Sequence, residues 1–251
     1  MSQFYIHPKR KTKVVFVQLG SPSEPTTKAL RKYLRKFLGD PRVVDINPWL
    51  WKLILNFFVL PFRPSKSAKL YARIWDGENF PLITNTRDFT KNVSDELKKI
   101  DPEGYVEVNH AFLLSPPYVN EVYDSWEEDL KKGIGATKLL VIPMFPQYSE
   151  STIASGIDAL AKELSKRVKI PTFEVITNFH RTHAFIDNSV CQVDKKLDEL
   201  LNQGKKIDNL IITFHGMQKR RIVNKGDDYY RHCYETFCLI TNKLKNIKPD
   251  Q

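Results

Sequence analysis

Short apolar runs alternate with amphipathic stretches along most of the chain. Strands are predicted within the runs 13–22, 105–114, 138–145, 172–179 and 209–214, and Gly20, Ser21 and Pro22 close the first strand with a loop. The stretches with helical spacing of apolar residues are 26–40, 88–100, 119–133, 154–168, 185–204 and 229–247. Strands that alternate with helices are joined by crossovers into a mainly parallel sheet with helices on both faces. The sequence therefore predicts an α/β fold, whose ligands bind at the carboxyl ends of the strands.

The charge of the chain is compatible with anionic partners but does not select one. The 251 residues carry a formal net charge of +10, with a pI near 9.4. Polyanions bind such proteins, and a generally basic surface is the simpler interpretation. The basic residues are spread along the chain without a repeated basic–aromatic module, so we expect no nucleic-acid partner.

The cysteine content favours a reducing, cytoplasmic compartment. Cys191, Cys233 and Cys238 are too few for a disulfide framework and do not form a CxxC metal motif. The N-terminal residues MSQFYIHPKRK lack the apolar segment of a secretory signal. No apolar run reaches the roughly 20 residues that cross a bilayer.

The loops after the predicted strands contain the residues that are candidates for catalysis or ligand binding. These loops read QLGSP, MFPQYSEST, TNFHRTH and TFHGMQKR. None contains GxGxxG or GxxxxGK[ST], so the sequence argues against nucleotide binding.

His215 is the first candidate for chemistry, because it directly follows the predicted strand 209–214. An imidazole there could act as a base near neutral pH or ligate a metal. Gly216 would allow a ligand to approach closely. The alternative is a histidine that only caps the strand through a backbone hydrogen bond.

The other candidates have simple structural interpretations. His180 and His183 would share a helical face, but they follow a strand, so an exposed loop is favoured. His232 lies beside Cys233 on a predicted helix, which indicates packing or a surface position. In the segment 146–152, Tyr148, Ser149 and Ser151 could hold a carboxylate at a helix N-terminus, or could simply cap the helix.

Residues 49–62, WLWKLILNFFVLPF, are unusually apolar. Burial in the core is the ordinary expectation for such a run. A lip around an apolar ligand and a contact with a membrane surface are the alternatives. Lys52, Arg63 and Lys66 flank the run, as suits an interfacial position.

Five ordered blocks of the sequence resemble the ferrochelatases. They are VQLGSP, YLRKFLGDPRVVDI, LPFRPSKSAKLYARIW, FPQYSEST and TFHGMQKRRIVNKGDDYYRHCYET. The resemblance runs over nearly the whole chain, and its blocks keep the order and spacing of the family.

This resemblance implies two similar α/β domains, one at 13–150 and a second at 151–251 that is incomplete in this chain. It implies insertion of Fe²⁺ into protoporphyrin IX or coproporphyrin III in haem biosynthesis. Ferrous iron is then a substrate; the sequence requires no cofactor and indicates no iron–sulfur cluster. The implied partners are the porphyrin, ferrous iron and a membrane surface touched by 49–62, in the cytoplasm or at the membrane periphery.

The same resemblance assigns residues. His215 is implied to be the catalytic base and the metal ligand. Porphyrin contacts are implied for seven residues, namely Leu19, Gly20, Ser21, Pro22, Tyr148, Ser149 and Ser151.

The sequence also departs from the family pattern. Leu113 and Leu114 stand where the family usually has an Arg–Tyr pair, and Gln218 stands where it often has proline. No residue of this chain can be given the role of the glutamate that faces the histidine in the family. These departures motivate an alternative, a catalytically impaired homologue that binds porphyrin or haem. A chelatase for cobalt or nickel tetrapyrroles is a third option.

Overall fold

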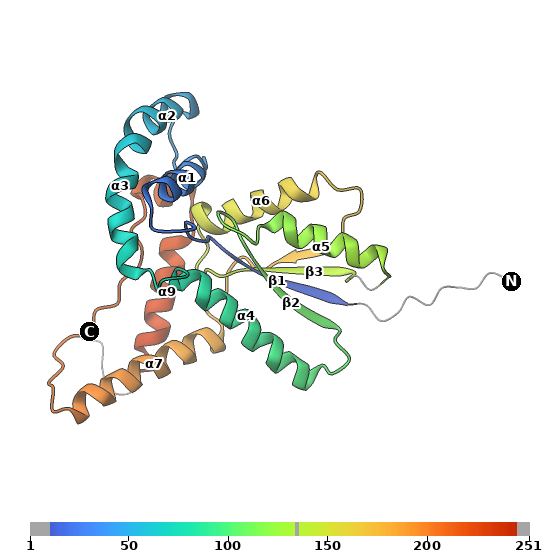
Figure 1. Ribbon diagram of the computed structural model, residues 1–251. Coiled ribbons are helices and arrows are strands. Elements are labelled where there is room, and N and C mark those ends of the chain that lie inside the picture. Colours follow the sequence, from blue (N-terminus) through green and yellow to red (C-terminus); the bar gives the residue numbers. More distant parts are fainter. Residues whose placement is uncertain (1–10, 134–135, 245–251) are drawn as a thin grey trace. The chain divides into compact units, whose positions relative to one another are not determined.

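The computed structural model describes residues 11–133 and 136–244, and the chain divides into two compact units (Figure 1). Unit 1 contains the residues up to Met144 together with Glu150–Ile176. Unit 2 contains Phe145–Ser149 and the residues from Thr177 onward. The expected domain ranges, 13–150 and 151–251, stay a prediction.

Unit 1 is built on a four-stranded parallel sheet in the order β2-β1-β3-β4. The strands are β1 (Thr12–Gln18), β2 (Val106–Phe112), β3 (Lys138–Pro143) and β4 (Thr172–Val175). Each paired strand runs parallel to its neighbour. The predicted α/β class with a parallel sheet is confirmed.

Helices cover both faces of this sheet, with α4 on one face and α5 and α6 on the other (Figure 1). Their bounds are α4 Pro81–Ile100, α5 Val119–Lys131 and α6 Ser155–Leu164. Successive strand residues point to opposite faces. Val15 and Val17 of β1 therefore join the core cluster under α5 and α6, while the Phe16 ring meets Phe89 of α4 at 5.1 Å.

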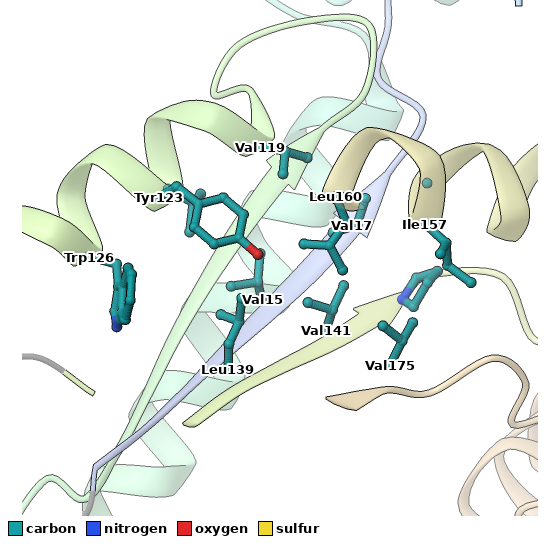
Figure 2. A pocket seen from close by; sticks show the side chains of 13 residues that line it. Val15, Val17, Val119, Tyr123, Trp126, Leu139, Val141, Ile157, Leu160 and Val175 are labelled. Carbon is teal, nitrogen blue, oxygen red and sulfur yellow. The ribbon is translucent and has the colours of Figure 1, made fainter. Parts of the chain in front are cut away.

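The core under α5 and α6 contains a small cavity (Figure 2). Its volume is about 20 Å³, and its walls are valine, leucine and aromatic side chains from β1, β3, α5 and α6. The Tyr123 hydroxyl is buried there without a hydrogen-bond partner. A water needs two to four polar partners, so we describe this cavity as a packing void of the core.

A second core cluster lies beneath α1 (Thr27–Leu38), α2 (Pro48–Ile54) and α3 (Leu60–Tyr71). The Thr26 hydroxyl caps α1 by accepting the N–H of Ala29 at 3.2 Å. A π-helical turn, η1 (Leu55–Val59), joins α2 to α3, and only Leu55 and Leu60 of the run 49–62 are buried.

The expectation that 49–62 packs in the core is therefore wrong for most of the run. Six large apolar side chains are exposed by 53–79%: Trp49, Leu50, Leu53, Phe57, Phe58 and Phe62. They recur about every four residues, so one side of the helices packs on the core cluster and the other faces outward. Among the described residues of unit 1, no other stretch exposes so many aromatic and leucine side chains in sequence.

Unit 2 consists of helices and irregular segments in its described part. The helices are α7 (His183–Asn202), α8 (Lys219–Lys225) and α9 (Tyr229–Thr241), and α7 packs against α9 (Figure 1). Its buried apolar cluster comprises Ile186, Ile240 and Leu244.

The strand expected at 209–214 is not formed, which corrects the prediction from its apolar composition. A parallel strand is held by hydrogen bonds to a neighbour. The described residues of unit 2 include no other strand, so this segment has no ladder to join. The strand expected at 172–179 is also shorter, because β4 ends at Val175 within unit 1.

Candidate functional site

The loop after β1 is shaped by Gly20. Its φ is +91°, a left-handed conformation in which side chains are strained, and a Cβ there would lie 2.3 Å from the Ser115 Oγ. The Ser21 N–H donates to the same Ser115 Oγ at 3.3 Å, and the Tyr33 hydroxyl donates to the Gly20 carbonyl at 3.4 Å. The loop is thus fixed on both sides of the glycine.

Only Leu19 of the four predicted loop contacts is partly exposed, since Gly20, Ser21 and Pro22 are buried. Leu19 lines a hollow of about 280 Å³ at this end of the sheet, next to Leu113 and Leu114. The hollow also has a polar side made by Asp40, Ser155, Asp158 and Lys162.

Polar groups on this side of the hollow are paired with other protein groups. Arg42 pairs with the Asp158 carboxylate, and the Ser155 hydroxyl donates to Asp40. The side lined by Leu19, Leu113 and Leu114 is therefore the part of the hollow that can contact apolar groups. Ser151 lies nearby in sequence, on the π-helical turn η3 (Glu150–Ala154) that precedes α6.

His215 lies in unit 2, in the irregular segment before α8, with its side chain exposed. Its backbone N–H donates to the Tyr229 hydroxyl at 3.1 Å. Burial, and then a hydrogen bond with the Cys233 thiol, raise the pKa of Tyr229 to about 12. The imidazole is thus presented on a backbone that α9 holds through Tyr229.

Two buried histidines form a cluster that the sequence did not predict. The rings of His180 and His232 stack with their centroids 3.9 Å apart. His180 is 2% exposed and His232 is 4% exposed. The His180 Nε2 lies 2.8 Å from a Glu235 carboxylate oxygen. The expectation of an exposed loop is wrong for His180, because the turn before α7 is covered by α9. His183, by contrast, is exposed at the start of α7.

A signal for this cluster was present in the sequence. His232 and Glu235 are three residues apart on a predicted helix, so they share one face. A face with an imidazole and a carboxylate needs polar partners when it is buried. His180 supplies one of them.

The segment Phe145–Ser149 is bound to the same helix. The Tyr148 N–H donates to the His232 Nδ1 at 3.1 Å, and the Gln147 amide donates to the Thr236 hydroxyl at 3.0 Å. Ser149 is 3% exposed. Tyr148 and Ser149 therefore belong with His215 in unit 2, whereas Leu19, Gly20, Ser21, Pro22 and Ser151 belong to unit 1.

The described residues contain no group of three or more histidine, cysteine, aspartate or glutamate side chains arranged to hold a metal ion. The sequence predicts one metal ligand, His215, and this role stays a prediction. Among the same described residues, no helix combines the length and the apolar character needed to cross a membrane.

The chain matches the sequence model of the family Ferrochelatase over residues 11–251. The chain belongs to the ferrochelatase family. The resemblance seen in the five sequence blocks is thereby confirmed.

Three relatives show the extent of the similarity, and each is named ferrochelatase. The protein of Idiomarina loihiensis is 38% identical over 234 residues, which are 93% of this chain and 61% of that protein. The protein of Francisella tularensis subsp. tularensis is 34% identical over 251 residues, with coverages of 99% and 71%. The protein of Actinobacillus pleuropneumoniae serotype 7 is 36% identical over 234 residues, with coverages of 93% and 68%. The chain thus spans less than two thirds of the Idiomarina ferrochelatase.

Proposed function

We propose that this protein is a ferrochelatase-type lyase that inserts Fe²⁺ into a porphyrin, protoporphyrin IX or coproporphyrin III, in haem biosynthesis. Membership of the ferrochelatase family over residues 11–251 carries the proposal. Ferrous iron and the porphyrin are the substrates, and the proposal needs no further cofactor.

His215 is the proposed catalytic base and metal ligand. Metal insertion removes two protons from pyrrole nitrogens; a neutral imidazole can accept one of them near neutral pH, and the other would pass to water. The same nitrogen lone pair can ligate ferrous iron before transfer. The exposed side chain of His215, on a backbone bonded to Tyr229, supports this role because it can approach a substrate without unfolding its segment.

The proposed porphyrin contacts divide into apolar and polar groups. Leu19 would pack on the macrocycle, while Gly20, Ser21 and Pro22 would give its loop the required shape. The hydroxyls of Tyr148, Ser149 and Ser151 would meet the propionates. The apolar wall that Leu19 forms with Leu113 and Leu114 supports the first assignment.

A specific observation favours a second candidate, a homologue that binds porphyrin or haem without catalysis. Leu113 and Leu114 line the hollow beside Leu19. The resemblance implies an arginine and a tyrosine at these two positions, so a cationic partner for a propionate is replaced by apolar surface. Porphyrin would bind in such a hollow mainly by burial of its hydrocarbon face.

The test is anaerobic insertion of Fe²⁺ into protoporphyrin, followed by loss of porphyrin fluorescence. We expect turnover by the wild-type chain, its loss in His215→Ala, and its retention in His183→Ala. His183 is the matched control because it is also an exposed histidine of unit 2. Binding of porphyrin without turnover would favour the second candidate, and the absence of both would contradict the two proposals.

We also propose that residues 49–62 place the protein on the cytoplasmic surface of a membrane. Their exposed side chains form an apolar stripe along α2, η1 and α3, flanked by Lys52, Arg63 and Lys66. Aromatic side chains suit the bilayer interface, and lysine and arginine attract anionic headgroups.

Co-sedimentation with vesicles of phosphatidylcholine and phosphatidylglycerol tests this contact. Phe58, 68% exposed, is the residue to change; Leu55 is unsuitable because it is 5% exposed and supports the core. We expect Phe58→Asp to reduce the bound fraction strongly. The control is Ile100→Asp, since Ile100 is 79% exposed at the end of α4, away from the stripe in sequence. A wild-type chain that does not sediment would refute the membrane contact.

A further inference from the structure

The stacked histidines of unit 2 join three separate stretches of chain. His180 precedes α7, His232 lies on α9, and Tyr148 belongs to the segment Phe145–Ser149. Both histidines are buried, and Tyr148 is half-buried. Of the three residues, only Tyr148 has a role in the catalytic proposal.

The hydrogen bond from Tyr148 fixes the state of His232. The Nδ1 of His232 accepts the Tyr148 N–H at 3.1 Å, so it must carry a lone pair and no proton. The proton of the neutral ring is then on Nε2. A charged imidazolium has protons on both nitrogens and cannot accept this bond. The contact therefore exists only with the neutral ring.

The state of His180 is set by Glu235. Its Nε2 lies 2.8 Å from the Glu235 Oε2 and donates to that carboxylate, while its Nδ1 is buried without a hydrogen-bond partner. A second ring proton would bury an N–H with no acceptor, which costs about 1–3 kcal/mol. Because the rings stack at 3.9 Å, charging both would also place two cations in contact.

The charged groups around the pair leave little to stabilise a cation on His232. On α9, the Arg231 Nη2 donates to Asp228 at 2.9 Å. It also lies 3.4 Å from the His232 Nε2, but with the ring proton on Nε2 both groups are donors and form no hydrogen bond. Arg231 also lies 3.4 Å from Glu235, which faces Arg181 at 3.9 Å from the turn before α7. Both carboxylates are thus shared with arginines. Burial, with His180 and Arg231 next, lowers the pKa of His232 below its ordinary 6.5.

Further hydrogen bonds hold the segment Phe145–Ser149 beside the two histidines. The Pro146 carbonyl accepts the Phe179 N–H at 3.0 Å, and Gln147 bonds to Thr236 at 3.0 Å. With the Tyr148 bond, three successive residues are tied to the turn before α7 and to α9. Of these three bonds, only the one to His232 depends on a group that titrates near neutral pH.

We propose that His232 is a positioning residue whose neutral ring fixes Tyr148 in the segment Phe145–Ser149, so that protonation of this ring releases the Tyr148 backbone. The consequence for porphyrin binding rests on the proposed function, because Tyr148 and Ser149 are proposed porphyrin contacts. The positioning of the segment itself does not depend on that function.

The direction of the pH dependence follows from the lowered pKa. Above pH 6.5 the ring is neutral whether or not the segment is bound, so the bond contributes in full. Below that value the released ring takes up a proton more readily than the bound ring. The Tyr148 backbone is therefore released progressively as the pH falls from 6.5 through the lowered pKa of the bound ring.

Amide hydrogen exchange of Tyr148 in the full chain, measured by NMR across this pH range and corrected for intrinsic exchange, tests the proposal. Two variants separate the interpretations. His232→Asn places a carboxamide oxygen where Nδ1 lies and does not titrate, whereas His232→Leu removes the acceptor.

We expect the wild-type protection of the Tyr148 amide to be constant above pH 6.5. Once the ring titrates below that pH, it should fall by up to about tenfold per pH unit. In His232→Asn the protection should stay and become independent of pH; in His232→Leu it should be low at every pH. Amides near Ile186 and Ile240 report whether each variant is folded.

A wild-type profile without pH dependence would overturn the proposal, as would protection of Tyr148 in a folded His232→Leu variant. If that variant does not fold, the pH profiles of the wild type and of His232→Asn still test the proposal. Porphyrin binding, followed by fluorescence quenching, forms a separate arm. Weaker binding at low pH in the wild type but not in His232→Asn would extend the positioning role to the substrate. Porphyrin affinity that does not change with pH while Tyr148 exchange does would refute Tyr148 and Ser149 as porphyrin contacts. The positioning role of His232 would remain.

Discussion

In unit 1 the strand backbones bond to one another, whereas in unit 2 side chains bond the backbone of irregular segments. The four strands of unit 1 pair in register along three parallel ladders. In unit 2 the N–H groups of Tyr148 and His215 donate to the side chains of His232 and Tyr229. Buried backbone groups need partners in either case. Where a ladder is not formed, specific side chains must supply them.

This contrast changes what a buried polar side chain contributes. In unit 1 the Tyr123 hydroxyl lies in the core with no hydrogen-bond partner. In unit 2 the Tyr229 hydroxyl accepts from the His215 N–H and bonds to Cys233. The same functional group should therefore destabilise one unit and stabilise the other.

The apolar cores should differ in how much a deleted side chain costs. Leu160, 4% exposed, belongs to the extensive cluster of unit 1, while Ile240, 8% exposed, belongs to the small cluster of unit 2. We expect Leu160→Ala to lower the unfolding free energy by about 3–5 kcal/mol and Ile240→Ala by about 2–3 kcal/mol. Native-state hydrogen exchange in β3 and in α9 measures the two losses separately.

Leu201→Ala is the matched control for both substitutions, because Leu201 is 48% exposed on α7. It should change the free energy by less than about 0.5 kcal/mol. A larger loss for Ile240→Ala than for Leu160→Ala would contradict the contrast between the two cores.

The next effect has the opposite sign. Tyr123→Phe removes the unpaired hydroxyl and keeps the ring beside the cavity. We expect the unfolding free energy of unit 1 to rise by about 1–2 kcal/mol, because the desolvation cost of the hydroxyl disappears. Hydrogen exchange of β1 and β3 amides measures the gain. A loss of stability would mean that the hydroxyl bonds to a water in the cavity of about 20 Å³.

The sequence predicted unit 1 well because its periodicities are simple. The residues Val14 to Val17 form a β-former run that is buried in β1, and the stretch 26–40 has the spacing that α1 shows. Strand β1 ends at Gln18, just before the loop that Gly20, Ser21 and Pro22 were predicted to form, and Gly20 adopts a left-handed conformation there. Apolar periodicity and turn residues are thus enough to predict most helices and strands of this unit.

The sequence could not give the contacts of unit 2 in the same way. The run 209–214 has the composition of a strand, but strand formation depends on a neighbour that composition does not reveal. The stacking of His180 on His232 joins residues 52 positions apart and follows no period. The exposed stripe at 49–62 was also ambiguous, because an apolar run does not state which of its residues face the core.

The hydroxyl of Tyr229 provides the counterpart to that of Tyr123. Tyr229→Phe leaves the His215 N–H without its 3.1 Å acceptor. We expect a loss of about 0.5–1.5 kcal/mol in the stability of the segment around His215 and faster exchange of the His215 amide. The measurement is amide exchange by NMR. Unchanged exchange at His215 would show that Tyr229 does not hold this backbone, and the contrast between the two tyrosines would fail.

The smallest effect concerns the surface, where the two units should not differ. Lys138 pairs with Glu174 in unit 1 at 2.7 Å, and Lys243 pairs with Asp187 in unit 2 at 2.6 Å. All four side chains are exposed by 42–56%. Solvent screens such pairs, so double-mutant cycles in urea should resolve no coupling in either unit.

The surface pair and the buried His232 bond should also weaken at different pH values. The hydrogen bond from Lys243, and then its charge, lower the pKa of Asp187 below its ordinary 3.8. Any stabilisation from this pair is therefore present above pH 3.8 and is lost as the pH falls through the lowered pKa. The His232 bond, in contrast, should weaken below pH 6.5, where Asp187 is still charged. If the protection of α7 and α9 and that of Tyr148 fell together near pH 3.8, the surface pair would control unit 2, and the buried histidines would not distinguish it from unit 1.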